Sequence, residues 1–348
     1  THSNHSNLPR TPTMPFVDEI LKYKSVSIVG MEKNTGKTEC LNYILRRLGH
    51  SNHRLAITSI GLDGEGLDQV TQTHKPEIFL TEGDVFVTSE AHFRSKKLDA
   101  EILDLSKQRT SLGRLVTARV TGSGKVMISG PSETFWIKKL IDDMAQFGVE
   151  TTLVDGALSR QSLGSPAITE SMVLATGAAL SANMHTLVSK TAFLHELICL
   201  PQWKSTQNDK LLQISSGLWS LDADGEIHDL GIESAFLLES NKEKLFTYGH
   251  TFYVSGAVTA GLLNFLRMQP GIEETVIIAR DFSRIFADKE SYQAFTKRGG
   301  QIKVLLHTKL IAVCVNPVSP QGYILDSKQL REKLTEKLGI PVYDIFKL

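Results

Sequence analysis

The sequence predicts an α/β fold, with a mostly parallel sheet flanked by helices and a second α/β region at the C-terminus. Three observations predict it. An apolar run, Val26–Val29, leads into a glycine-rich loop and then a helical pattern. Further apolar runs alternate with amphipathic helical stretches, which is typical of βαβ units and a parallel sheet. The same alternation returns from Thr251 to the end of the chain.

The loop after the first strand has the composition of a phosphate-binding loop (P-loop). Gly30 and the triplet Gly36-Lys37-Thr38 are separated by five residues, one more than in the standard pattern. Such a loop binds phosphate through backbone N–H groups, while its lysine reaches the β/γ-phosphates and its hydroxyl binds Mg²⁺. We therefore expect the nucleotide to be bound by Gly30, Lys33, Asn34, Thr35, Gly36, Lys37 and Thr38. Within this set, we expect Lys37 to be catalytic as well and Thr38 to be a metal ligand as well. The alternative is an ordinary strand–helix turn in which Thr35 or Thr38 caps the helix.

The other elements of the first half follow from apolar periodicity. Helices are expected at Phe16–Tyr23, at Glu39–Leu48 and through Ile137–Met144. Single strands are expected at Arg54–Ile60, Leu112–Thr121, Val126–Ser129 and Thr151–Val154, with glycines at 122 and 124 that break the second of them. A pair of short strands, joined at residues 82–84, is expected within Glu77–Ser89.

The second half begins with Ser165–Leu200, which we interpret as mostly helical with residues 175–179 inside it. Leu211–Glu239 is β-rich and contains a hairpin turn at 222–225, where the aspartates lack the rest of a calcium-loop pattern. The remaining expected elements are strands at Thr251–Ser255, Thr275–Ala279, Ile302–Leu306 and Leu310–Val315, helices at 257–268 and Ser327–Leu338, and a closing strand at Val342–Ile345.

This pattern predicts three segments: a disordered lead-in (1–15), a nucleotide-binding domain (16–204) and a C-terminal α/β domain (205–348). Continuation of one large sheet through the C-terminal part is the alternative. Gly30, Asp63, Gly130 and Asp155 each follow a predicted strand. Because the carboxyl ends of parallel strands share one edge, we expect these four residues to line one crevice.

Two aspartates are candidates to bind Mg²⁺ beside Thr38. Such a metal takes a carboxylate from the end of another central strand. Asp155 and Asp63 both fit that position, and we also expect Asp155 to be catalytic. Each is alternatively a helix cap or a turn carboxylate.

Composition narrows the classes of function. The chain has 348 residues with 38 basic and 38 acidic side chains, so nothing in its net charge indicates a nucleic-acid or membrane partner. Its three cysteines are far apart and lie in apolar surroundings, which favours buried thiols in a reducing compartment. No apolar run approaches the ~18 residues of a membrane span. We therefore expect a cytoplasmic protein.

Three stretches resemble the P-loop group of dethiobiotin synthetase and the amidoligases of cobalamin synthesis: Gly30–Thr38, Ile60–Gly64 and Val154–Ala157. Loops of that group also have five residues between their glycines. The resemblance implies a P-loop fold that binds ATP or another nucleoside triphosphate with Mg²⁺. It also implies a metal role for the acid at position 155, which is Asp here where that group has Glu. The chain lacks the second lysine with which those enzymes hold a substrate carboxylate.

Over its whole length the chain is similar to the reactivase subunit of cobalamin-dependent lysine 5,6-aminomutase, in the phrases GLDGEG (61–66), EGDVFVTSEA (82–91), VDGALSRQS (154–162) and VLATGAALS (173–181). This similarity implies an ATPase that acts as an accessory factor and has the aminomutase or a second reactivase subunit as its partner. One alternative is an ATP-dependent synthetase or kinase that acts on a small carboxylate or amine. Another is a module that binds nucleotide without hydrolysing it.

Overall fold

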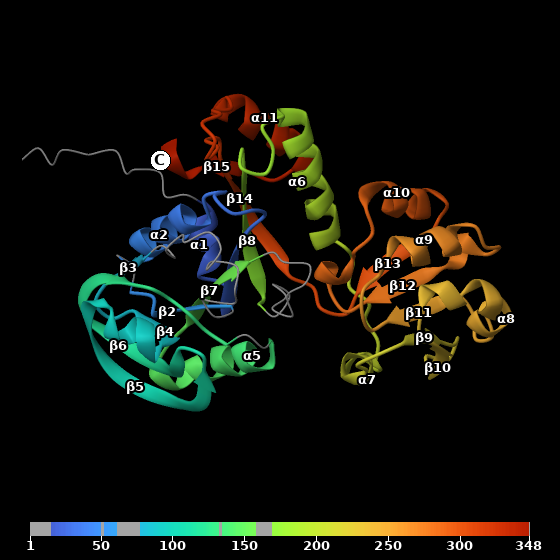
Figure 1. Ribbon diagram of the computed structural model, residues 1–348, viewed down its shortest axis with the longest axis horizontal. Helices are drawn as coiled ribbons and strands as arrows, with labels where there is room; N and C mark the ends of the chain where they lie inside the picture. Colours follow the sequence, from blue (N-terminus) through green and yellow to red (C-terminus); the bar gives the residue numbers. More distant parts are fainter. Residues whose placement is uncertain (1–14, 50–51, 61–76, 132–133, 158–168, 348) are drawn as a thin grey trace, which may run out of the picture. The chain divides into compact units, whose positions relative to one another are not determined.

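The computed structural model describes residues 15–49, 52–60, 77–131, 134–157 and 169–347. The protein is α/β, with a large, mostly parallel sheet flanked by helices and a second, smaller sheet (Figure 1). The chain divides into two compact units, Thr1–Ile28 with Gly36–Asp155 and Val29–Thr35 with Gly156–Leu348. The division at residue 205 stays a prediction, since the smaller sheet lies after it whereas β14 and β15 join the larger one.

Among the described residues, the larger sheet has ten strands, in the order β15-β14-β8-β1-β7-β2-β4-β6-β3, with β5 paired to β6. The strands of the first unit are β1 (Ser25–Gly30, which continues into the second unit), β2 (Leu55–Ser59), β3 (Ile78–Leu80), β4 (Val85–Ser89), β5 (Lys97–Thr110), β6 (Gly113–Val126) and β7 (Thr151–Ala157). Its helices are α1 (Pro15–Ile20), α2 (Lys37–Leu48), α4 (Glu90–Arg94), α5 (Thr134–Asp143) and the 3-10 turn η1 (Met144–Phe147).

Strand β2 lies between two parallel neighbours in the first unit. It pairs with β7, with Ser59 opposite Asp155, and with β4, with Ala56 opposite Val85. Beyond β4 the direction changes, because β6 is antiparallel to β3, β4 and β5. The carboxyl ends of β2, β4 and β7 therefore lie at one edge and their amino ends at the other.

The second unit contributes three strands to the larger sheet, β8 (Ser171–Gly177), β14 (Lys309–Asn316) and β15 (Val342–Asp344). Its smaller sheet has the order β10-β9-β11-β12-β13, with β9 (Leu218–Leu221), β10 (Ile227–Ile232), β11 (Thr251–Val254), β12 (Val276–Ala279) and β13 (Gln301–Val304). Helices of this unit are α6 (Met184–Ile198), α7 (Asn208–Gln213), α8 (Lys242–Leu245), α9 (Ala260–Arg267), α10 (Lys289–Lys297) and α11 (Ser327–Leu338). Its 3-10 turns are η3 (Ala235–Leu237), η4 (Glu239–Asn241), η5 (Ile272–Glu274), η6 (Phe282–Arg284) and η7 (Ile345–Lys347).

Side-chain caps fix the starts of the longer helices in this unit. Asn183 Oδ1 accepts a hydrogen bond from Thr186 N at 3.0 Å at the start of α6, and Asp326 Oδ1 accepts one from Gln329 N at 2.8 Å at the start of α11. Helices α9 and α10 pack beside the smaller sheet (Figure 1), and buried side chains of both belong to the same apolar cluster as β11–β13. Among the described residues, no helix is both long enough and apolar enough to cross a membrane.

The helical prediction for Ser165–Leu200 is wrong at residues 171–177, and residues 165–168 lie outside the described residues. Ser171–Gly177 forms β8, every residue of which is buried, and α6 begins only after Asn183. A strand buried on both faces has a continuous apolar sequence and lacks the alternation that identifies a half-buried strand. Over seven residues, such a run cannot be distinguished from a helix by periodicity.

The predictions around residue 122 are also wrong. The glycines at 122 and 124 do not interrupt a strand, because β6 continues through them to Val126. No strand forms at residues 127–129, and the long partner strand β5 was not predicted. The two short strands β3 and β4 do form, but both pair with β6. The hairpin turn at 222–225 is confirmed, since Asp222 Oδ1 accepts from the backbone N–H groups of Asp224 and Glu226, both at 2.9 Å.

Gly124 is required by this β5–β6 pairing. A Cβ at this position would lie 1.9 Å from the carbonyl oxygen of Lys97, an atom of the neighbouring backbone that cannot move without displacing β5. We predict that Gly124→Ala lowers the free energy of unfolding by about 1–3 kcal/mol in urea titrations followed by circular dichroism. Gly256→Ala is the control, because a Cβ there would meet no atom within 4 Å. Equal stability of the two variants would contradict the close approach.

Candidate functional site

Helix α2 begins without a side-chain cap. Gly36 precedes α2 with φ 90° and ψ 16°, a left-handed conformation that glycine adopts without strain, and it has no side chain to cap the helix. Helix α2 has twelve residues, and its first internal bond runs from Cys40 N to Gly36 O at 2.9 Å. A helix N-terminus has N–H groups without partners inside the helix and a partial positive charge, so it favours an anionic group.

The preceding loop residues, Gly30 at the end of β1 and then Met31–Thr35, are shaped by bonds within the second unit. Asn34 has φ 62°, an uncommon conformation for a residue other than glycine, and its carbonyl oxygen accepts from the Asn316 side chain at 3.2 Å. The hydroxyl of buried Thr35 donates to Glu32 O at 2.8 Å. Glu32 accepts from Lys33 N through its carboxylate at 3.0 Å. Thr35 therefore holds the loop closed, and Glu32 is part of its internal structure.

The first residue of α2 forms an ion pair with the end of β7. Lys37 Nζ lies 2.7 Å from Asp155 Oδ1, and the two side chains are 28% and 9% exposed. Removing a carboxylate from water is unfavourable unless a partner compensates its charge. The nearby ammonium group supplies that compensation for the almost buried Asp155.

The backbone around Asp155 is held by β2. Ser59 Oγ donates to Asp155 O at 3.2 Å, and Ile60 N donates to the same oxygen at 2.9 Å. Gly130 lies against this pair of strands, because a Cβ at that position would be 2.0 Å from Ser59 O. Gly130 and Asp155 of the predicted crevice therefore meet at one edge of the sheet, at the end of β2.

Of the predicted metal ligands, Thr38 lies half-buried in the first turn of α2, directly after Lys37, and Asp155 is paired with Lys37. Asp63 lies outside the described residues. Within the described ranges, no group of three or more His, Cys, Asp and Glu side chains is arranged to hold a metal ion. Two protein oxygens are nevertheless a suitable set for Mg²⁺, which usually keeps several waters and takes further oxygens from substrate phosphates.

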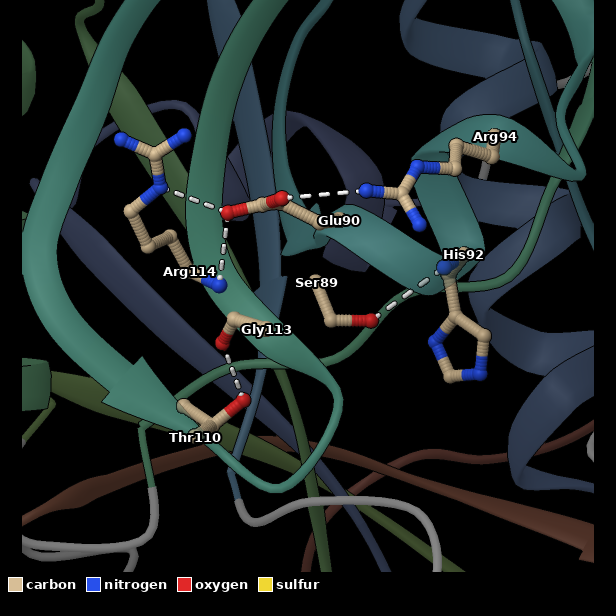
Figure 2. A network of polar contacts seen from close by, with 7 residues as sticks. All are labelled: Ser89, Glu90, His92, Arg94, Thr110, Gly113 and Arg114. Atoms are coloured by element: carbon tan, nitrogen blue, oxygen red, sulfur yellow. Dashed lines mark hydrogen bonds and ion pairs between the residues drawn. The ribbon is translucent and has the colours of Figure 1, made fainter.

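The same edge of the sheet has a polar cluster that the sequence did not predict. Buried Ser129 accepts from Ser89 N at 2.9 Å and lies 3.2 Å from Thr88 Oγ1 and 3.1 Å from His92 Nδ1. Ser89 also caps the short helix α4 by accepting from His92 N at 3.3 Å (Figure 2). The one signal in the sequence was hydroxyl residues at the ends of apolar runs, and nothing in the sequence indicated that residues 88 and 129 meet.

An ion-pair network fixes α4 on the β5–β6 hairpin. Glu90 Oε1 accepts from Arg114 Nε at 2.7 Å and from Arg114 N at 3.0 Å, while Glu90 Oε2 accepts from Arg94 at 3.3 Å (Figure 2). The hydrogen bonds from Arg114 hold the pKa of the Glu90 carboxyl below its usual value. This network orients α4, and with it His92, at the carboxyl end of β4.

Comparison with protein-family models and with curated proteins found no match to this chain. The functional assignment therefore depends on the site itself. That site consists of a left-handed glycine at the start of α2, the Lys37–Asp155 ion pair beside it, and a group of hydroxyl residues at the ends of the neighbouring strands.

Proposed function

We propose that this chain binds a magnesium nucleoside triphosphate, ATP or a close analogue, through the loop Gly30–Thr38 and hydrolyses it. The observation that carries the proposal is the Lys37–Asp155 ion pair at 2.7 Å, next to the uncapped start of α2. A P-loop needs a lysine, a hydroxyl and a helix N-terminus at one place, with a carboxylate from a neighbouring strand. Lys37, Thr38, Gly36 and Asp155 fill these positions.

The ion pair suggests a separate role for Lys37 and for Asp155 when the nucleotide binds. A triphosphate offers Lys37 stronger and more numerous acceptors than one carboxylate, so Lys37 would exchange Asp155 for the β/γ-phosphates. Asp155 would then hold Mg²⁺ together with Thr38, directly or through water. Mg²⁺ supplies neutralisation of the charge that develops during phosphoryl transfer.

The second unit has a cavity that includes loop residue Asn34 in its lining. It has a volume of about 770 Å³, and its lining includes Asn34 of the loop and Asn316 and Pro317 at the end of β14. Ile324 and Phe346 add apolar surface. Apolar walls with a few amides suit a planar heterocyclic base, which needs stacking surface and hydrogen-bond partners at its edge.

The role of hydrolysis rests on the resemblance to the aminomutase reactivase subunit. We propose that nucleotide turnover drives exchange of damaged cobalamin from a cobalamin-dependent amino-acid aminomutase, with this chain as accessory factor. The second candidate is an ATP-dependent synthetase or kinase for a small carboxylate or amine. His92 at the carboxyl end of β4 favours it, because its partly exposed imidazole, held by buried Ser129, is placed to orient a second substrate.

We predict that Lys37→Ala weakens binding of Mg·ATP by at least about thirtyfold in titration calorimetry, because a charged partner of the phosphates is lost. Lys22→Ala is the matched control, since Lys22 is exposed and pairs with Glu19 outside the loop. Circular dichroism melting should show that both variants fold. Unchanged affinity for ATP and GTP in the folded Lys37→Ala variant would contradict the proposed nucleotide site.

We predict that Asp155→Ala raises the Mg²⁺ concentration needed for half-maximal nucleotide binding by about tenfold or more. Metal-free ATP should bind more tightly, because Lys37 no longer has a competing carboxylate. The two effects have opposite signs, so general damage to the fold cannot mimic them. An unaltered Mg²⁺ titration would show that Asp155 is not the metal ligand.

Phosphate release distinguishes the two candidate functions. For an accessory ATPase, hydrolysis by the chain alone should be slow and should change on addition of a purified cobalamin-dependent lysine aminomutase. For a synthetase or kinase, a small carboxylate or amine should stimulate release without any protein partner. No phosphate release under either condition, with ATP bound, would contradict the hydrolase and leave a nucleotide-binding module.

A further inference from the structure

Another pocket lies in the first unit, at the opposite edge of the sheet from Asp155. Its volume is about 430 Å³, and it is lined by Leu55 and Val85, the first residues of β2 and β4. Ser59, the last residue of β2, lies next to Asp155 instead. The pocket is therefore at the amino ends of these strands, separate from the proposed phosphate site.

One wall of this pocket is basic. Arg119 Nη2 donates to Phe147 O at 2.9 Å. Arg54 covers the next residue, since a Cβ on Gly148 would lie 2.6 Å from Arg54 Nη1. The two guanidinium groups thus converge on the turn at residues 147–148. Among the described residues, neither one forms an ion pair, although both line the pocket.

Another part of the lining is acidic. Glu82 and Asp84 both face the pocket. Asp84 Oδ2 accepts from Thr81 N at 3.0 Å and from Thr81 Oγ1 at 3.2 Å, and burial raises the pKa of this carboxyl. In the described part of the chain, neither acid pairs with a basic side chain. Charges of opposite sign therefore share one pocket without reaching ion-pair distance of each other.

His53 also lines the pocket but is already engaged. Its Nε2 lies 2.9 Å from Thr151 Oγ1, and its Nδ1 lies 3.3 Å from the Glu150 carboxylate. The charged groups left for a ligand in this lining are therefore the two guanidinium groups and the two carboxylates. A simple anion would meet both arginines but also both acids, and a simple cation would face the reverse conflict. A ligand that has both charges satisfies all four groups.

We propose that this pocket binds a small zwitterion of the free α-amino acid class. Its carboxylate contacts Arg54 and Arg119, because their planar guanidinium groups match the geometry of a carboxylate. Its ammonium group lies towards Asp84 and Glu82. The inference goes beyond the nucleotide site and does not depend on it, because its residues lie at the other ends of the strands.

The test uses the full chain without nucleotide. Each of the twenty proteinogenic L-amino acids is titrated singly by calorimetry, and the tightest ligand is compared with its analogues that lack the ammonium or the carboxylate. We expect saturable binding of at least one amino acid, and at least about tenfold weaker binding of both analogues. Arg54→Ala and Asp84→Asn should each weaken binding about tenfold or more. Arg109→Ala, an exposed arginine on β5 outside the pocket, should leave it unchanged.

Three results would overturn the proposal. The first is that none of the twenty amino acids binds. The second is that inorganic phosphate binds more tightly than every amino acid and loses this binding in Arg54→Ala, which would make the pocket, and not the loop at Lys37, a simple anion site. The third is that Arg54→Ala, which removes an exposed side chain, leaves the affinity unchanged. Asp84→Asn retains an oxygen that can accept from Thr81, so loss of binding in that variant reports the lost charge.

Discussion

The ion pair between Lys37 and Asp155 joins the first residue of α2 to the last part of β7, two segments more than a hundred residues apart in the chain. Asp155 is almost buried, so its charge requires a partner. Lys37 can reach it because Gly36 turns the chain in a left-handed conformation immediately before the helix. The geometry of the whole candidate site depends on this arrangement, because it places a cation, a carboxylate and a helix N-terminus together.

The parallel pairing of β2 with β7 and β4 gives the sheet of the first unit two chemically different edges. At the carboxyl ends, Asp155, Ser59 and Ser129 are buried polar residues, and Asp155 pairs with Lys37 at the start of α2. At the amino ends, Arg54 and Arg119 line a pocket that also contains acids. Parallel strands separate these edges by their full length, so one small unit can hold two ligand sites that share no residue.

The antiparallel hairpin β5–β6 supports residues at both of these edges. Through Glu90, Arg114 fixes the short helix α4, and α4 holds His92 beside Ser129 (Figure 2). Arg119 of the same hairpin strand β6 lines the pocket at the other edge. Strand β6 therefore contributes residues to both edges.

The sequence by itself determined the local features of this protein. The glycine-rich loop before α2, the limits of α11 at Ser327–Leu338 and the turn at 222–225 were all predicted, because periodicity, caps and turn residues act within a few positions. Asp155 was selected because it follows an apolar run. The tertiary structure alone decided the rest. The run at 171–177 is a strand because it is buried, and the glycines at 122 and 124 continue a strand because β5 approaches there. Likewise Ser129 meets Thr88, and Arg54 and Arg119 line one pocket, only through packing between distant segments, which no local pattern records.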